Sequence, residues 1–171
     1  MKNLAGLLFA TFLSILSCRS QDFKINERKI LSNANLDYYL KALKNEQFTP
    51  LVKRRDIPDF IKEQLPWIND KEMADIGQKY QATDVIQDEN LPWRRLLFAC
   101  NNKHVLVVTY VHGGFGTNYK ILFVRYADRR VKDVWIGTTF CNDLVSVTNI
   151  LRCIQENRNK KWGLNTNFVS M

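Results

Sequence analysis

The feature that most constrains the fold is a change in hydrophobic periodicity at Arg94. From there to Thr139, apolar and polar residues alternate with the period of two that is typical of strands. Four segments rich in Val, Ile, Leu, Phe and Tyr have this pattern, namely 94–100, 104–111, 119–127 and 131–139. The connections that follow the first and third segments are short, and short connections join antiparallel neighbours. We therefore expect a four-stranded antiparallel meander.

Helical periodicity flanks this predicted sheet on both sides. Asn35 is expected to cap a helix with the apolar stripe Leu36, Tyr39, Leu40 and Leu43. Two shorter helices are expected after it, one capped by Asp56 and one capped by Asn69. Asn142 is expected to cap a last helix whose stripe is Leu144, Val147, Leu151 and Ile154. The predicted fold class is α+β, with N-terminal helices, the meander and a C-terminal helix packed on the sheet.

The start of the chain predicts export. Lys2 supplies a positive charge, Leu4 to Leu16 is almost entirely apolar, and polar sequence begins at Arg19. These features are typical of an export signal over residues 1–17. The apolar run is shorter than the roughly 20 residues that a bilayer-spanning helix needs. Removal of the signal leaves about 150 residues, which suits a single domain.

The end of this signal, Ile15-Leu16-Ser17-Cys18, resembles the bacterial lipobox. The resemblance implies that Cys18 carries lipid such as palmitate, becomes the mature N-terminus and anchors the protein to a membrane. The expected location is then the cell envelope, as a periplasmic or outer-membrane-associated lipoprotein, and plain secretion is the alternative. Residues 18–33 are polar and are expected to act as a tether, which leaves 34–171 as a single α+β domain.

Composition and charge indicate a globular protein with acidic partners. Hydrophobic residues make up 46% of the chain and charged residues 25%, which is globular rather than disordered composition. The formal net charge is +8. A basic exported protein favours anionic lipid headgroups, anionic glycans or acidic proteins as partners. Because the protein is expected to be exported, we expect no nucleic-acid partner.

A glycine-rich segment after the second predicted strand is a candidate binding loop. It comprises His112, Gly113, Gly114, Phe115, Gly116 and Thr117. Glycine admits backbone conformations that other residues avoid, and Phe115 between two glycines is hard to bury locally. The strand and its His-Gly-Gly sequence resemble the oxyanion segment of esterases, but the Gly-x-Ser-x-Gly nucleophile motif of that machinery is missing from the chain. A long hairpin turn without function is the alternative interpretation.

The cysteines predict at most one disulfide. With Cys18 assigned to lipid, Cys100, Cys141 and Cys153 remain. The meander places Cys100 and Cys141 at opposite ends of the sheet, whereas a helix running back along the sheet returns Cys153 to Cys100. The expected pair is therefore Cys100–Cys153, and three reduced thiols are the alternative.

Motif analysis favours binding over catalysis. The spacing of His and Cys residues suggests no metal site, and no phosphate-binding or dinucleotide-binding glycine pattern occurs. We expect no catalytic residues, no metal and no cofactor. The predicted function is a non-enzymatic binding module that captures an exported partner, as an inhibitor or immunity protein does. The alternative is an envelope hydrolase that acts on an anionic polymer.

Overall fold

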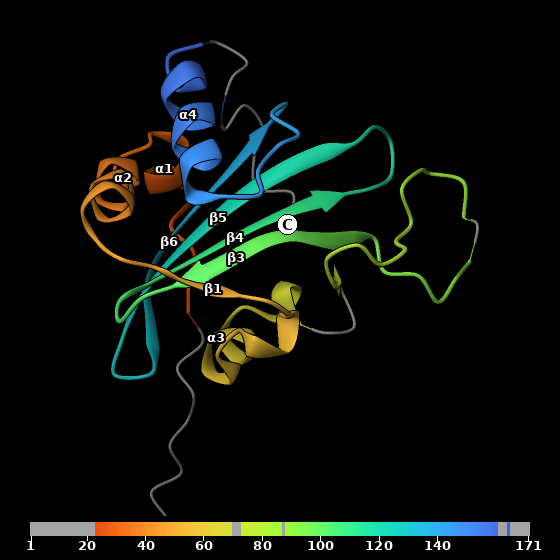
Figure 1. The fold of residues 1–171 in the computed structure, drawn as a ribbon, viewed down its shortest axis with the longest axis horizontal. Coiled ribbons are helices and arrows are strands. Elements are labelled where there is room, and N and C mark those ends of the chain that lie inside the picture. The colour runs from red at the N-terminus through yellow and green to blue at the C-terminus, as the bar shows by residue number, and fades with distance from the viewer. Residues whose placement is uncertain (1–22, 70–72, 87, 161–163, 165–171) are drawn as a thin grey trace, which may run out of the picture.

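The computed structural model describes residues 23–69, 73–86, 88–160 and 164, and its centre is an antiparallel sheet (Figure 1). Strands β3 (Arg94–Asn101), β4 (Val105–His112), β5 (Asn118–Ala127) and β6 (Arg130–Thr139) are neighbours in that order. They are the predicted meander. Each strand has at least eight residues, so the alternation of apolar and polar side chains repeats often enough to be recognised in the sequence.

Two short strands extend the sheet beyond the predicted four. Strand β1 (Thr49–Leu51) pairs antiparallel with the end of β3, and β2 (Met73–Ala74) pairs parallel with its beginning. These strands have three and two residues, which is too short for alternation to be recognised in a sequence. The observed sheet therefore has six strands, not four.

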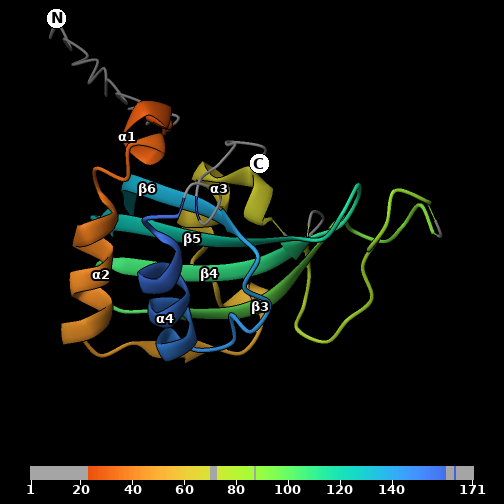
Figure 2. The same ribbon diagram turned by 90° about the horizontal axis from the view of Figure 1, so that it is seen from above.

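Helices cover both faces of the sheet (Figures 1 and 2). Helices α2 (Leu36–Asn45) and α4 (Val147–Asn157) lie on one face, and α3 (Asp59–Gln64) lies on the other with the 3-10 turns Arg54–Asp56 and Pro66–Ile68. On the first face Tyr39 of α2 stacks on Phe123 at 5.1 Å between ring centroids. On the second face Phe60 of α3 contacts Tyr126 edge-on at 5.4 Å. Seven of the eight residues of β4 are buried, because both of its faces are covered.

The predicted helix α2 is confirmed, and three other helix predictions need correction. Helix α3 begins at Asp59 with Pro58 as its N-cap residue, so Asp56, which lies in the 3-10 turn before it, is not its cap. No helix begins at Asn69 in the described chain, since Met73–Ala74 forms β2 and Gly77 has a positive φ of 77°. Pairing with β3 outweighs the helical propensity there. The last helix begins at Val147, where the Ser146 hydroxyl accepts a hydrogen bond from the Asn149 amide, so Asn142 is not its cap.

The expected tether contains a helix that packs on the domain. Helix α1 (Glu27–Leu31) buries Ile30. Lys29 Nζ lies 2.8 Å from Asp133 Oδ2, and the Trp135 indole donates to Asn33 Oδ1 at 2.9 Å. Residues from Glu27 onward therefore belong to the folded domain rather than to a tether that ends at residue 33.

The predicted disulfide pairing is wrong. Cys141 pairs with Cys153 across a Cα–Cα distance of 6.2 Å, and Cys100 is a buried free thiol. The prediction assumed one continuous helix from Asn142, which would hold Cys141 and Cys153 too far apart. In the structure the chain from 142 to 146 is a loop, so α4 turns back and carries Cys153 to the end of β6.

Candidate functional site

Three connecting segments gather at one end of the sheet, which we call the loop end. They are 75–93 before β3, 113–117 between β4 and β5, and 140–146 after β6. Antiparallel order brings them together, because Arg94 pairs with His112 and Tyr119 pairs with Thr139. In Figure 1 the first two segments lie at the right-hand side of the molecule.

The candidate binding loop is anchored at its base and exposed at its tip. The Gly113 amide donates to the Trp93 carbonyl at 2.9 Å. A Cβ atom on Gly113 would lie 1.8 Å from the Gln81 carbonyl oxygen, so only glycine fits there. Gly114 and Gly116 have positive φ values of 110° and 85°, which glycine adopts without strain. The glycines thus fix the loop against segment 75–93 and turn its tip into solvent.

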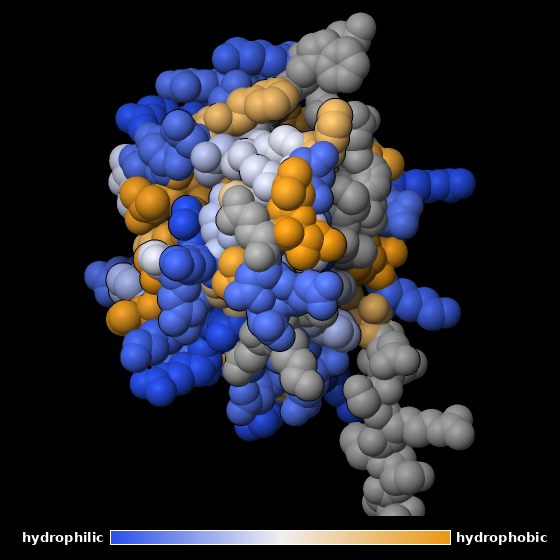
Figure 3. Space-filling view, turned by 90° about the vertical axis from the view of Figure 1, so that its right-hand side faces the viewer, coloured by the Kyte–Doolittle hydropathy of each residue, from blue (hydrophilic) through white to orange (hydrophobic). Residues whose placement is uncertain are grey.

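Apolar side chains are exposed at the loop end. Phe115 is 96% exposed and Phe140 is 81% exposed, while Trp93 is exposed to 38%. Val85 and Ile86 of segment 75–93 add exposed fractions of 67% and 60%. Figure 3 looks at the side of the molecule that carries segments 75–93 and 113–117, and shows hydrophobic patches among hydrophilic residues. The loop end therefore exposes several apolar side chains within polar surroundings.

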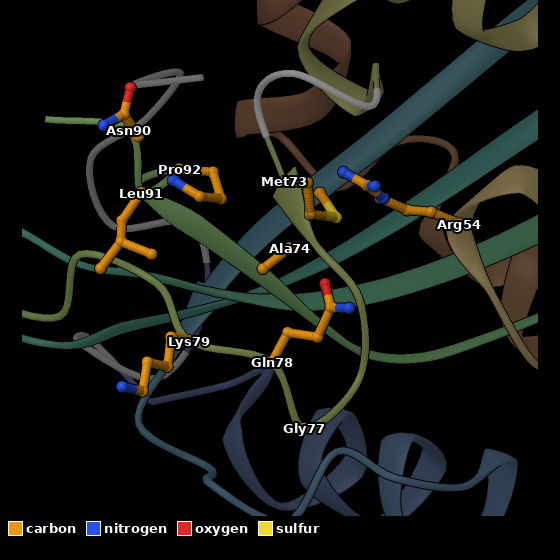
Figure 4. A pocket seen from close by; sticks show the side chains of 9 residues that line it. All are labelled: Arg54, Met73, Ala74, Gly77, Gln78, Lys79, Asn90, Leu91 and Pro92. Atoms are coloured by element: carbon orange, nitrogen blue, oxygen red, sulfur yellow. The ribbon is translucent and has the colours of Figure 1, made fainter. Parts of the chain in front are cut away.

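A pocket of about 770 Å³ opens beside the loop end (Figure 4). Its described lining consists of Arg54, Met73, Ala74, Gly77, Gln78, Lys79, Asn90, Leu91 and Pro92. Figure 4 shows Arg54 on one side of Met73 and Ala74, with Asn90 and Leu91 on the other. This volume falls within the range of small-ligand sites, roughly 300–1,000 Å³.

Two side chains of the pocket lining, Arg54 and Lys79, are cationic. The polar groups around Arg54 are bonded to one another. The Arg54 amide donates to Asp75 Oδ1 at 2.7 Å, and Arg54 Nε lies 3.6 Å from the same oxygen. The Asp75 amide in turn donates to Gln78 Oε1 at 3.2 Å. The lining side chains that the structure describes include no carboxylate, imidazole, thiol or hydroxyl group. Arg54 and Lys79 suit an anionic ligand.

Behind the binding loop lies a group of buried polar side chains on the α3 face of the sheet. Tyr110 pairs with Lys120 and Lys120 pairs with Thr138, so the three share one face of β4, β5 and β6. Lys120 is only 3% exposed, and its Nζ donates to Thr138 Oγ1 at 2.7 Å. His112 is half-buried and adjoins Arg94, which donates through Nη1 to the Trp67 carbonyl at 3.0 Å.

Burial and mutual repulsion shift the pKa values in this cluster. Burial, and then the Arg94 guanidinium, lowers the pKa of Lys120 to about 8. Burial raises the pKa of Tyr110 to about 12 although Arg94 acts in the opposite direction. Burial and the charges of Arg94 and Lys120 lower the pKa of His112. These groups therefore form an electropositive interior next to an exposed loop.

The sequence predicted the exposed glycine-rich loop, which remains a candidate binding loop, but it did not predict the polar groups behind that loop. His112 was singled out as part of the loop, and the structure places it at the loop base facing Lys120. Lys120 and Tyr110 looked like ordinary members of two strands. One feature of the sequence could have indicated the buried charge. Lys120 lies inside the apolar run Tyr119–Val124, and strand alternation places it on the same face as Leu122.

Several sequence expectations concern residues outside this site. Cys18, the expected lipidation residue, lies outside the described residues. Within the described ranges, no group of His, Cys, Asp and Glu side chains could hold a metal ion. No helix among them is long and apolar enough to cross a membrane.

The chain matches no protein-family model, no curated protein and no solved structure. We therefore infer function from the chemistry and geometry of the site itself.

Proposed function

We propose that this protein is an exported, lipid-anchored binding module of the cell envelope, and that its loop end captures an acidic exported protein, as an inhibitor or immunity protein does. Export and lipid attachment at Cys18 rest on the signal and lipobox-like sequence of residues 1–18. The Cys141–Cys153 disulfide supports export, because disulfides persist mainly in oxidising compartments.

The observation that carries the proposal is the exposure of Phe115 and Phe140 at one end of a rigid sheet. Large apolar side chains with this exposure leave unfavourable surface in water, and a patch with a polar rim is typical of an interaction site. Aromatic side chains also supply much of the binding energy at protein interfaces. The net charge of +8 favours an acidic partner through faster encounter.

Site-specific photocrosslinking tests the proposal. A benzophenone amino acid in place of Phe115 or Phe140 should form adducts with one acidic exported protein when the full chain is made in its native cells. Tyr38 of α2 is the matched control, because it is an aromatic residue with 46% exposure that lies near Arg125, towards the other end of β5. The crosslinker at position 38 should not capture that protein.

Three results would contradict this function. Equal capture from position 38 would mean that the adducts reflect crowding rather than a binding surface. Absence of any adduct from positions 115 and 140 would remove the loop end as a contact surface. Adducts that contain an anionic glycan and no protein would identify a different class of partner.

Metabolic labelling tests the lipid anchor separately. A palmitate analogue supplied to a bacterial host should label the wild-type protein and not Cys18→Ala. Equal labelling of the two proteins would assign the lipid to another residue. Absence of label from both would favour plain secretion.

The alternative function is hydrolysis of an anionic polymer at the pocket that contains Arg54 and Lys79. The size and the two cations of the pocket suit the binding of an acidic polymer segment, whereas the acid–base groups for hydrolysis would have to come from outside its described lining. An assay for new reducing ends after incubation with polygalacturonate tests this function. Activity that is lost in Arg54→Ala and retained in the Phe115 variants would favour the hydrolase.

A further inference from the structure

We propose that Tyr110, His112 and Lys120 form a binding site for a compact oxyanion, a carboxylate or a phosphate group, beneath the binding loop. The site is independent of the partner proposed for the loop end. It stands on three observations: the shared face of the three residues, a buried ammonium group with one neutral acceptor, and a buried phenol without an acceptor.

The strand register gathers the three side chains. Tyr110 and His112 are two residues apart on β4 and therefore point to the same face. Lys120 of β5 is the direct partner of Tyr110 and a diagonal neighbour of His112. Lys120 therefore lies on the same face as the phenol and the imidazole. Its ammonium group reaches towards Thr138 on β6, and its charge acts on His112.

The Lys120 ammonium group lacks a counterion among the described residues. An ammonium group has three N–H donors, and Lys120 uses one on the Thr138 hydroxyl. None of the ion pairs between described side chains includes Lys120. Buried charges in proteins are normally paired, because an unpaired one loses the hydration of the unfolded state. An oxyanion would accept the remaining donors and supply the counter-charge.

Tyr110 supplies a second donor on the same face, as the direct strand partner of Lys120. Its side chain is 1% exposed and its hydroxyl has no hydrogen-bond partner among the described residues, which is rare for a buried polar group. The raised pKa keeps this hydroxyl protonated at neutral pH, so it acts as a donor. The Trp67 indole N–H is also buried without an acceptor, and the Trp67 carbonyl holds the Arg94 guanidinium.

The residues of the cluster that lie nearest the binding loop are only partly buried. His112 and its partner Asn118 are half-buried, whereas Tyr110 and Lys120 one row deeper are buried. In the loop itself, the Cβ position of Gly116 has no heavy atom within 4 Å, and that of Gly114 has the Trp93 side chain at 4.0 Å. A compact anion would reach Lys120 past His112 from the loop end. The nearby positive charge of Arg94 would attract the anion.

Amide NMR titrations of the mature protein with sodium phosphate and with sodium acetate, at constant ionic strength set by chloride, test this site. We expect saturable shifts confined to residues around Tyr110, His112 and Lys120. Lys120→Met should weaken the affinity about tenfold or more, and Tyr110→Phe should weaken it severalfold. Lys132→Met is the matched control, because Lys132 is an exposed lysine on β6, and it should retain the wild-type affinity.

Comparison of the two anions distinguishes a phosphate ligand from a carboxylate ligand. Tighter phosphate binding supports a phosphate group as the ligand, and tighter acetate binding supports a carboxylate. The site is overturned if neither anion gives saturable shifts, or if Lys120→Met or Tyr110→Phe binds as the wild type does. Tyr110→Phe removes a single oxygen atom that has no partner among the described residues, so it tests the site independently of Lys120→Met.

Discussion

At the scale of single residues, the burial of Lys120 in the sheet lowers the stability of the fold. It occupies a position with 3% exposure where an apolar side chain would pack without desolvating a charge. Its pKa is depressed from 10.5 to about 8, so the folded state releases the proton more easily than the unfolded chain. Proteins retain such groups where binding requires them, at the expense of stability.

Replacement of Lys120 by methionine should stabilise the fold at pH 7. The unfolded chain binds more protons than the folded state between the folded pKa of about 8 and the unfolded value of 10.5, so wild-type stability rises with pH in that window. The advantage of Lys120→Met should be about 1–3 kcal/mol at pH 7 and should shrink as pH rises towards 10. Urea unfolding of both proteins in chloride buffer from pH 7 to pH 10 measures it. A constant difference would contradict the depressed pKa.

Gly113→Ala should destabilise the protein more than Gly116→Ala. The added methyl group at position 113 would collide with the Gln81 carbonyl, whereas Gly116 has no heavy atom within 4 Å of the Cβ position. We expect a cost of about 1–3 kcal/mol or more at position 113 and about 1 kcal/mol, from the positive φ alone, at position 116. Thermal unfolding compares the two. The reverse ranking would mean that segment 75–93 does not pack on the loop.

At the scale of elements, α4 is held to the end of β6 by covalent and polar contacts. Cys153 of α4 forms the disulfide with Cys141, and the Thr139 hydroxyl lies 3.2 Å from Cys153 Sγ. The side-chain amide of Asn157 in α4 also donates to Cys141 Sγ at 3.5 Å. Thr109 of β4 adds a hydrogen bond from its hydroxyl to the Leu144 carbonyl at 2.7 Å, so the loop before α4 is fixed to the sheet.

Peptide mapping without reduction should recover Cys141 linked to Cys153, with Cys100 as a free thiol. Cys100 should react with a thiol reagent only after unfolding, because burial raises its pKa to about 12. Closing a loop of 12 residues should contribute about 2–3 kcal/mol, which the double variant Cys141→Ser, Cys153→Ser would lose. Recovery of a Cys100–Cys153 peptide would instead restore the pairing expected from the sequence and contradict the observed course of residues 142–146.

At the scale of the whole molecule, the two ends of the sheet differ in what covers them. Near the far end of β5, Arg125 lies over the Tyr38 ring of α2, and Asn102 in the β3–β4 turn donates to Glu46 just after α2. The loop end instead leaves Phe115 and Phe140 in water and a cluster of cations inside. The fold therefore places its candidate binding chemistry at the end away from these contacts.

A protein that begins at Ala34 should be less stable than one that begins at Phe23. The shorter protein loses the buried Ile30, the Lys29–Asp133 ion pair and the acceptor of the Trp135 indole. We expect a loss of about 2–4 kcal/mol. Denaturant unfolding of the two purified proteins measures it. Equal stabilities would show that residues 23–33 are a tether after all.

Local sequence determined the elements that are long and periodic. The four meander strands and α2 follow from side-chain alternation and from the stripe of Leu36, Tyr39, Leu40 and Leu43, because such patterns repeat often enough to outweigh competing conformations. The Gly113–Gly116 loop was also recognisable, since closely spaced glycines interrupt a strand. The export signal and lipobox-like sequence remain predictions from sequence alone.

Tertiary structure decided the features that depend on contacts between distant residues. Strand β2 exists because β3 offers it unpaired backbone groups, and α1 exists because Asp133 and Trp135 give it partners about a hundred positions away. The pairing of Cys141 with Cys153 depends on where α4 starts, and the predicted cap, Asn142, lies four residues before the observed cap, Ser146. The proposed oxyanion site depends on register. The sequence predicted that β4 and β5 are antiparallel neighbours, but it did not predict that Tyr110 lies directly opposite Lys120.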